Sequence, residues 1–231
     1  MLKARYKAAI LILAGLIAGG FGLFFMLQPG NEQEALDLQS VALMDSIEQG
    51  ESRITLNKPL IAAKIDYYDA PEEQDLIPLE GVLPVSEEEA AQDQAGAQQI
   101  TGMGILEIEK IDLKMPVSYG AGDKQLKVSA GWIPQTAQIG GFGNAVIAGH
   151  RNYAYGSHFN RLGELSVGDA IQYSSIDGET MQFIIVETLE VLPSDPVAFE
   201  QDENVQMLTL YTCTPIRSAT HRLLVRAVRV A

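Results

Sequence analysis

The feature that most constrains this chain is a series of short, apolar, β-type segments that begins near Gly104 and continues to the C-terminus. Gly, Pro and Asp residues separate the segments, and none has the long period of an amphipathic helix. The segments are residues 105–108, 115–117, 144–148, 170–174, 181–191, 207–213 and 222–230. Many short strands at close spacing predict an all-β barrel or sandwich, which we place at residues 101–231.

Two local patterns refine this prediction. Asp177-Gly178 lies between two of the segments and is typical of a β-hairpin turn. Residues 160–165 could form a single helical turn. No internal repeat is visible, so the strands are expected to form one barrel-like domain with short helices.

The N-terminus predicts a membrane anchor. Ala8 to Leu27 is a run of 20 residues without a charge, which matches the length of a helix that crosses the hydrocarbon core. Lys3, Arg5 and Lys7 precede this run, so residues 1–7 are expected in the cytoplasm and the rest of the chain outside. A cleaved signal peptide is the alternative, although its apolar core would be shorter and small residues at a cleavage spacing are lacking.

Residues 28–100 are strongly acidic and predict an extracytoplasmic stalk. Within 31–100 there are 16 acidic and three basic residues, out of 30 acidic residues in the chain. Residues 34–49 could form a short amphipathic helix, and residues 61–68 could pack on the domain. From residue 101 onward the charges nearly balance, at 14 acidic and 10 basic residues. No basic patch is present, so nucleic acid is not expected as a partner.

Cys213 is the single cysteine. It cannot form an intramolecular disulfide, and no Cys-rich zinc site can be built; no cofactor or metal is expected. A lone cysteine is often a small buried hydrophobe. Here it ends an apolar strand just before Thr214-Pro215, and alternation places it on the more polar face with Thr209 and Tyr211. These features favour a nucleophilic thiol, which needs a nearby base or cation.

His150 and Arg222 are the candidate partners of Cys213. His150 follows the apolar segment 144–148, and Arg222 opens the last predicted strand, nine residues after the cysteine. That spacing suits two neighbouring antiparallel strands, in which Arg222 could face the thiol while His221 faces away. A guanidinium can stabilise a developing oxyanion, although a surface cation explains an arginine on a strand equally well. His158 is interpreted as structural or solvated.

The motifs, in order, resemble those of the sortase family. They are Asn144-Ala145-Val146-Ile147-Ala148-Gly149-His150-Arg151, then Thr209-Leu210-Tyr211-Thr212-Cys213, then His221-Arg222-Leu223-Leu224-Val225. In that family a histidine ends one barrel strand, a cysteine closes a TLxTC strand and an arginine opens the next. The resemblance covers about residues 102–230.

The resemblance implies an eight-stranded barrel that is a membrane-anchored cysteine transpeptidase of Gram-positive bacteria. Cys213 would attack an LPxTG-like sorting signal to form a thioester, which an amine of a lipid-linked peptidoglycan precursor would resolve. His150 would transfer the protons, and Arg222 would stabilise the oxyanion. Thr212, Tyr211 and Asn144, together with the loop 192–206, are expected to bind the peptide.

The single N-terminal anchor and the run Thr220-His221-Arg222 look most like class D sortases. Pilin-polymerising class C enzymes are the alternative, but they usually carry a second membrane segment and a lid with an Asp-Pro-aromatic motif, neither of which is seen here. An L,D-transpeptidase is disfavoured because Tyr211-Thr212, not a Ser-x-Gly run, precede the cysteine. A non-catalytic, membrane-tethered β-barrel binding module is the remaining alternative.

Overall fold

The computed structural model describes residues 31–56, 98–151 and 158–230. The predicted membrane helix at 8–27 lies outside these ranges, and no helix among the described residues is long and apolar enough to cross a membrane. The chain divides into two compact units, residues 1–38 and 39–231. The second unit holds the whole β-sheet.

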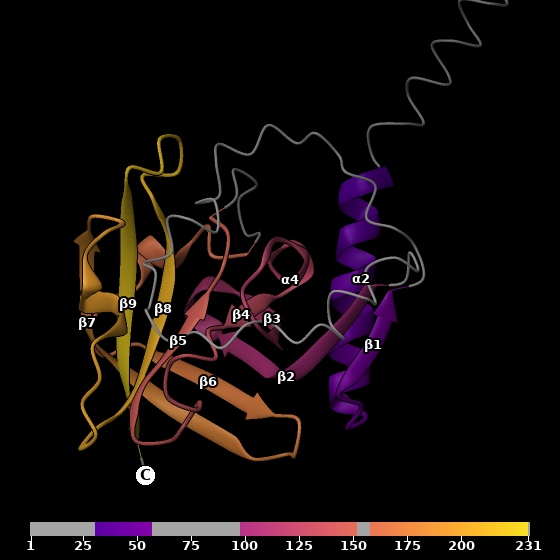
Figure 1. Cartoon of the computed structure of the whole chain (residues 1–231), viewed down its shortest axis with the longest axis horizontal. Helices are drawn as coiled ribbons and strands as arrows, with labels where there is room; N and C mark the ends of the chain where they lie inside the picture. The colour runs from indigo at the N-terminus through magenta and orange to yellow at the C-terminus, as the bar shows by residue number, and fades with distance from the viewer. Residues whose placement is uncertain (1–30, 57–97, 152–157, 231) are drawn as a thin grey trace, which may run out of the picture. The chain divides into compact units, whose positions relative to one another are not determined.

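Eight strands close into a barrel (Figure 1), which confirms the all-β prediction and the eight-stranded barrel that the family resemblance implies. The strands in chain order are β2 (Gln98–Ile108), β3 (Leu113–Tyr119), β4 (Ala130–Trp132), β5 (Gly143–Ala148), β6 (Ala170–Ser175), β7 (Thr180–Val191), β8 (Gln206–Thr214) and β9 (His221–Val230). Their order in the sheet is β2-β3-β4-β5-β8-β9-β7-β6, and pairing of β2 with β6 closes it. The β3–β4 and β5–β8 pairs are parallel.

The barrel interior is filled by the apolar side chains that alternate inward along the strands. On the site-bearing strands these include Ala145, Ile147, Leu208, Leu210 and Leu223, all at most 8% exposed. Such burial is the main source of stability for a barrel of this size. The alternate residues of β5, β8 and β9 therefore face outward, and the candidate site lies on this outer face.

A second apolar cluster covers the outer face of β5, β8 and β9. It is built from Ile133, Val146, Ala148, Ala198, Tyr211 and Leu224. Ala198 belongs to η4 (Pro196–Phe199), a short helix in the connection between β7 and β8. The loop 192–206, which was predicted to bind the peptide, therefore packs against the outer face of the strands that carry the motifs.

The helices and the N-terminal strand are short additions to the barrel. They are α2 (Asn31–Glu48), β1 (Arg53–Leu56), η2 (Glu109–Ile111), α4 (Asp123–Val128) and η3 (Leu162–Glu164). The strand β1 pairs with the start of β2, and Leu43 and Ile47 of α2 lie against Gly102, where no side chain blocks their approach. Only α2 and β1 lie in the segment 28–100 that was predicted as a stalk; residues 57–97 of that segment lie outside the described residues.

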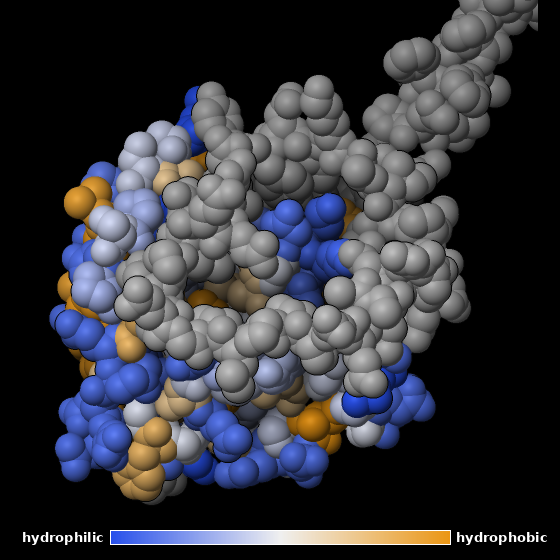
Figure 2. Space-filling model, viewed as in Figure 1, coloured by the Kyte–Doolittle hydropathy of each residue, from blue (hydrophilic) through white to orange (hydrophobic). Residues whose placement is uncertain are grey.

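The surface of the domain is mixed rather than apolar. The coloured part of the face in Figure 2 is mostly hydrophilic, with hydrophobic residues scattered over it. Exposed large apolar side chains include Tyr119, Phe142, Val167 and Leu192, which lie on different elements. Single exposed hydrophobes of this kind are normal for a folded protein.

Candidate active site

The β8–β9 ladder places Cys213 directly opposite Arg222. Directly opposite residues of an antiparallel pair lie on the same face of a sheet, about 4.5–5.5 Å apart at Cβ. Two residues before Cys213, Tyr211 pairs with Leu224 on the same face. The thiol and the guanidinium, predicted to meet from their nine-residue spacing, are therefore brought together by strand register alone.

Arg222 is held by three hydrogen bonds to neutral acceptors. Its Nε donates to the Tyr211 hydroxyl at 3.1 Å, and its Nη1 donates to the carbonyls of Ala219 at 2.9 Å and His221 at 3.1 Å. The side chain is only 4% exposed. A buried cation whose hydrogen bonds go to uncharged groups is stabilised by any anion that forms beside it.

The parallel β5–β8 pair brings His150 to the same place. The register aligns Ala148 with Tyr211, and the Gly149 amide continues it by donating to the Tyr211 carbonyl at 3.1 Å. The Thr212 hydroxyl donates to the Gly149 carbonyl at 2.7 Å. His150 follows this pair by two residues, as Cys213 does on β8, so continuation of the register would bring the two residues to the same level of the neighbouring strands.

The segment after His150 folds back on it. The Phe159 amide donates to the His150 carbonyl at 3.0 Å, and the ring of Phe159 is fully buried in the barrel. The Arg151 guanidinium donates to the carbonyls of Asn160 at 3.4 Å and Cys213 at 3.5 Å. His158 places its ring centroid 6.4 Å from that of His150. Side-chain and backbone contacts, rather than a strand ladder, therefore position the imidazole.

Burial keeps both reacting groups neutral at rest. It raises the pKa of the Cys213 thiol above its usual value, an effect that Arg222 and, less strongly, Arg151 oppose. Burial also lowers the pKa of His150 to about 4, with a further contribution from His158. In general, a neutral imidazole that comes within hydrogen-bond reach of a neutral thiol can accept the thiol proton as the sulfur attacks a carbonyl.

The three residues predicted to bind the peptide have structural partners. Tyr211 lies on the face of Cys213, packs against Phe199 at a centroid distance of 5.8 Å and accepts from Arg222. Thr212 lies on the inward face, 1% exposed, with its hydroxyl on Gly149. Asn144 is also 1% exposed. Direct contact of Thr212 or Asn144 with a peptide stays a prediction.

Asn144 anchors the loop that holds η4. Its Nδ2 donates to the carbonyls of Ala198 at 2.9 Å and Glu200 at 3.2 Å, while its Oδ1 accepts from Thr209 Oγ1 at 2.7 Å. Arg226, opposite Thr209 on β9, donates to the Val197 carbonyl at 3.0 Å. Polar side chains from three strands thus fix one wall of the outer face.

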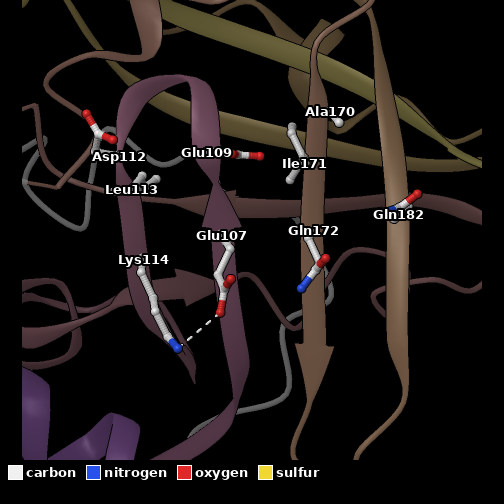
Figure 3. A pocket seen from close by; sticks show the side chains of 9 residues that line it. All are labelled: Glu107, Glu109, Asp112, Leu113, Lys114, Ala170, Ile171, Gln172 and Gln182. Carbon is white, nitrogen blue, oxygen red and sulfur yellow. Dashed lines mark ion pairs between the residues drawn. The ribbon is translucent and has the colours of Figure 1, made fainter.

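A separate pocket lies on the other side of the barrel, lined by β2, β3, β6 and β7 (Figure 3). Its carboxylates include Glu107, which pairs with Lys114 at 3.2 Å, as Figure 3 shows. The hydrogen bond to Glu107 raises the pKa of Lys114. Within the described ranges, no three His, Cys, Asp or Glu side chains are grouped to hold a metal ion.

The sequence did not indicate the positions of Arg151, which contacts the Cys213 carbonyl, and of His158, whose ring lies near that of His150. The one feature of the sequence that could have indicated Arg151 was its place directly after His150, where a charged residue follows an apolar strand. His158 was interpreted as structural or solvated. The contact of His158 with His150 depends on a backbone reversal after the strand, where His158 adopts φ 47°. No pattern of alternation encodes such a reversal.

Comparison with known proteins agrees with this geometry. The Sortase domain family matches residues 106–230. Sortase D of Bacillus subtilis is 26% identical over 225 residues, 95% of this chain and 96% of that protein. Sortase A of Streptococcus agalactiae is 25% identical over 150 residues, 63% of this chain and 60% of that protein.

Solved structures agree as well. A Clostridium perfringens sortase D5 transpeptidase has a TM-score of 0.52 and 28% identity, covering 69% of this chain and 98% of that chain. Sortase C1 from Streptococcus agalactiae has a TM-score of 0.53 and 34% identity, covering 55% of this chain and 67% of that chain. This chain also covers 64% of the length of a further solved structure, Sortase C1 of GBS Pilus Island 1. With more than half of its residues matched by the family model, and with Cys213 paired to Arg222 across β8 and β9, the chain belongs to the sortase family of cysteine transpeptidases.

Proposed function

We propose that this protein is a membrane-anchored transpeptidase that cleaves an LPxTG-like sorting signal and joins the cleaved protein to a cell-wall amine. The single observation that carries the proposal is the convergence of β5, β8 and β9 on one end of the outer face. There Cys213 pairs with Arg222, and His150 follows the last β5–β8 hydrogen bond. A buried structural cysteine would not need either partner.

Acylation begins with transfer of the thiol proton to His150 while Sγ attacks the carbonyl carbon of the scissile bond. The imidazolium then gives that proton to the leaving amine as the carbon–nitrogen bond breaks, which leaves a thioester on Cys213. In the second half an incoming amine attacks the thioester and loses a proton to His150. The thiol is released when Sγ takes that proton back, so the enzyme ends as it began.

Arg222 stabilises the tetrahedral intermediates. Its three hydrogen bonds fix the planar guanidinium opposite the sulfur, and these bonds use only Nε and Nη1. A preorganised donor of this kind requires no reorganisation when negative charge develops on the carbonyl oxygen. Thr212 and Asn144 act in this proposal through the segments they hold, namely Gly149 and η4.

The membrane part of the proposal rests on the uncharged run Ala8–Leu27 and the basic residues before it. It places the barrel outside the cytoplasmic membrane, where sorting signals and lipid-linked peptidoglycan precursors meet. The match to Sortase D over 95% of this chain supports a class D enzyme with a single N-terminal anchor.

The test is to incubate the full-length chain in detergent with fluorogenic LPxTG-like and LPxTA-like peptides, with and without an added amine. Mass spectrometry would follow the acyl-enzyme and the product. We expect an adduct on Cys213 and an amide product when amine is present. Cys213→Ala should form neither, whereas Arg229→Gln, on the far part of β9, should retain both.

The remaining outcomes distinguish the alternatives. Acid as the only product, whatever amine is supplied, would indicate a protease. Transfer only to a lysine side chain of a pilin-like peptide would indicate a class C activity. Absence of an adduct with every peptide would indicate a binding module and would overturn the proposal.

A further inference from the structure

Arg151 lies just past the end of β5 and contacts residues on both sides of the candidate active site. Its Nη1 lies 3.5 Å from the carbonyl oxygen of Cys213, and its Nε lies 3.4 Å from that of Asn160. Arg151 also follows His150 directly in the chain. One side chain therefore contacts the residue that carries the thiol and the segment around Asn160, in which the Phe159 amide donates to the His150 carbonyl.

The surroundings leave room for this guanidinium. A Cβ atom at Gly163 of η3 would lie 2.7 Å from Nη2 of Arg151, closer than such atoms approach in proteins. The guanidinium therefore lies close to the backbone of Gly163. The packing indicates a defined place for Arg151 rather than a freely solvated side chain.

The charge of Arg151 acts on the thiol. Among the residues that the structure describes, its hydrogen bonds go to backbone carbonyls, and no carboxylate lies within ion-pair distance. Burial lowers its pKa, while Glu190 and Cys213 oppose this effect. Glu190 accepts from Thr214 Oγ1 at 3.2 Å, so it contributes only a longer-range attraction. Cys213 thus lies between two cations, Arg222 and Arg151.

We propose that Arg151 is a positioning residue that ties the His150 segment to the Cys213 carbonyl and places a second positive charge near the sulfur. The need for it follows from the end of the β5–β8 ladder at Gly149. Beyond that point the described contacts of the backbone around His150 are those of Thr212, Phe159 and Arg151. The proposal rests on the proposed role of Cys213 as nucleophile.

The experiment measures thiol reactivity, which requires no peptide substrate. The rate at which iodoacetamide alkylates Cys213 is recorded against pH in the full-length chain, for the wild type, Arg151→Gln and Arg151→Lys. Removal of a cation near a thiolate should raise the apparent thiol pKa by about 0.5–1 unit in Arg151→Gln. Arg151→Lys keeps the charge but lacks the planar fork, so the thiol pKa should stay close to that of the wild type while kcat falls about tenfold.

Arg229→Gln is the matched control. Arg229 also donates from Nη1 to a backbone carbonyl, that of Gly140, at 2.9 Å. It lies seven residues beyond Arg222 on the same strand, about 23 Å away. Its loss should leave the thiol pKa unchanged, because only a charge near the sulfur affects that value.

An unchanged thiol pKa together with unchanged kcat in Arg151→Gln would overturn the proposal. If Arg151→Gln does not fold, as judged by the loss of its thermal unfolding transition, the test rests on Arg151→Lys. Turnover at the wild-type rate in Arg151→Lys would then overturn the positioning role. A wild-type enzyme that processes no peptide would contradict the transpeptidase function instead. The alkylation data would still report on Arg151 in that case.

Discussion

The two sides of the active site are built by different means. On the β8–β9 side, Cys213 and Arg222 face each other across a continuous antiparallel ladder that runs from Met207 to Thr214. On the β5 side the ladder ends at Gly149. The backbone around His150 is then held by the Thr212 hydroxyl on Gly149, the Phe159 amide on His150 and the bond from the next residue, Arg151, to the Cys213 carbonyl. The first side is determined by strand register, whereas the second depends on individual side chains.

The two sides should therefore respond differently to substitution. A register shift of one residue would move Cys213 to the opposite face, so the thiol–guanidinium pair is either present or absent. The imidazole side can change gradually, because each of its contacts can be weakened alone. Substitutions of the ladder pair should therefore abolish activity, whereas substitutions of the contacts that hold the His150 segment, with His150 itself unchanged, should alter its rate, substrate affinity or pH range.

The largest effect is expected for Arg222. Arg222→Ala should lower kcat/KM by at least about 100-fold, the magnitude associated with a lost oxyanion donor. Arg222→Lys should recover little of this, because an ammonium cannot reproduce the bonds to Tyr211, Ala219 and His221 from one planar group. Steady-state kinetics with the preferred peptide would measure both.

Arg229→Lys is the control on the same strand. Arg229 contacts Gly140 and Glu179, far from the thiol, so its replacement should leave kcat/KM within about twofold of the wild type by the usual independence of distant sites. Near-normal turnover in Arg222→Lys would mean that charge alone suffices, and the preorganised geometry would lose its assigned role.

Thr212 connects the two sides. Thr212→Val removes the donor from the buried Gly149 carbonyl at nearly constant volume, so unfolding free energy should fall by about 1–3 kcal/mol. Because Gly149 precedes His150, kcat should also fall about tenfold, as expected when a catalytic group is displaced. Thr212→Ser keeps the hydroxyl and should restore kcat. A kcat as low in the Ser variant as in the Val variant would show that the hydroxyl alone does not restore the position of His150, and would contradict the role assigned to this hydrogen bond.

The sequence predicted the barrel because alternation and turn residues are local properties. The Asp177-Gly178 turn has Gly178 at φ 86°, with the Ser175 amide bonded to the Glu179 carbonyl. The strand Ala130–Trp132 was missed because it has three residues and a central glycine. The helix and strand before residue 57 were only partly predicted, because their packing on Gly102 is a tertiary contact.

For the site, spacing alone predicted only one of the two sides. The nine residues between Cys213 and Arg222 suit a short connection between neighbouring strands, and the ladder has that register. The parallel pairing of β5 with β8 joins segments more than 60 residues apart, so the sequence made His150 a candidate only through its place after an apolar segment and through the family resemblance. Arg151 and His158 act past the strand end, where periodicity carries no information.

A smaller effect is expected for substitution of Asn144, which tests whether the loop that contains η4 helps to bind the peptide. Asn144→Ala removes the bonds to Ala198 and Glu200, about 20 Å along β5 from His150. The KM for peptide should rise about three- to tenfold with kcat nearly unchanged, since a few kcal/mol of loop anchoring is lost away from the chemistry. The steady-state kinetic constants would measure this split.

The double variant Asn144→Ala/Thr209→Val separates stability from binding. The Thr209 hydroxyl donates to Asn144 and would be left unpaired by the single change. Its removal should recover part of the lost unfolding free energy, yet KM should stay raised because the loop is still unanchored. Recovery of KM together with stability would show that the wall has no separate role in binding.

The smallest effect concerns the acid limit of activity. A His150 pKa of about 4 predicts that kcat/KM declines near pH 4 rather than near 6.5, because the protonated ring cannot accept the thiol proton. The ordinary value applies in the unfolded chain, which binds a proton more readily below pH 6.5. Stability from this group is therefore present above pH 6.5 and is lost as pH falls towards 4.

His158→Asn sharpens this prediction, and asparagine tolerates the left-handed backbone at φ 47°. The other charges acting on His150 are Asp123 and Lys127 of α4, which oppose each other. Loss of the like charge at His158 should raise the His150 pKa by about 0.5 unit and lower kcat/KM about twofold at pH 4. Asp123→Asn should shift the acid limit in the opposite direction, because it removes the one attraction. Shifts of the same sign in both variants would show that burial alone, not charge, sets the acid limit.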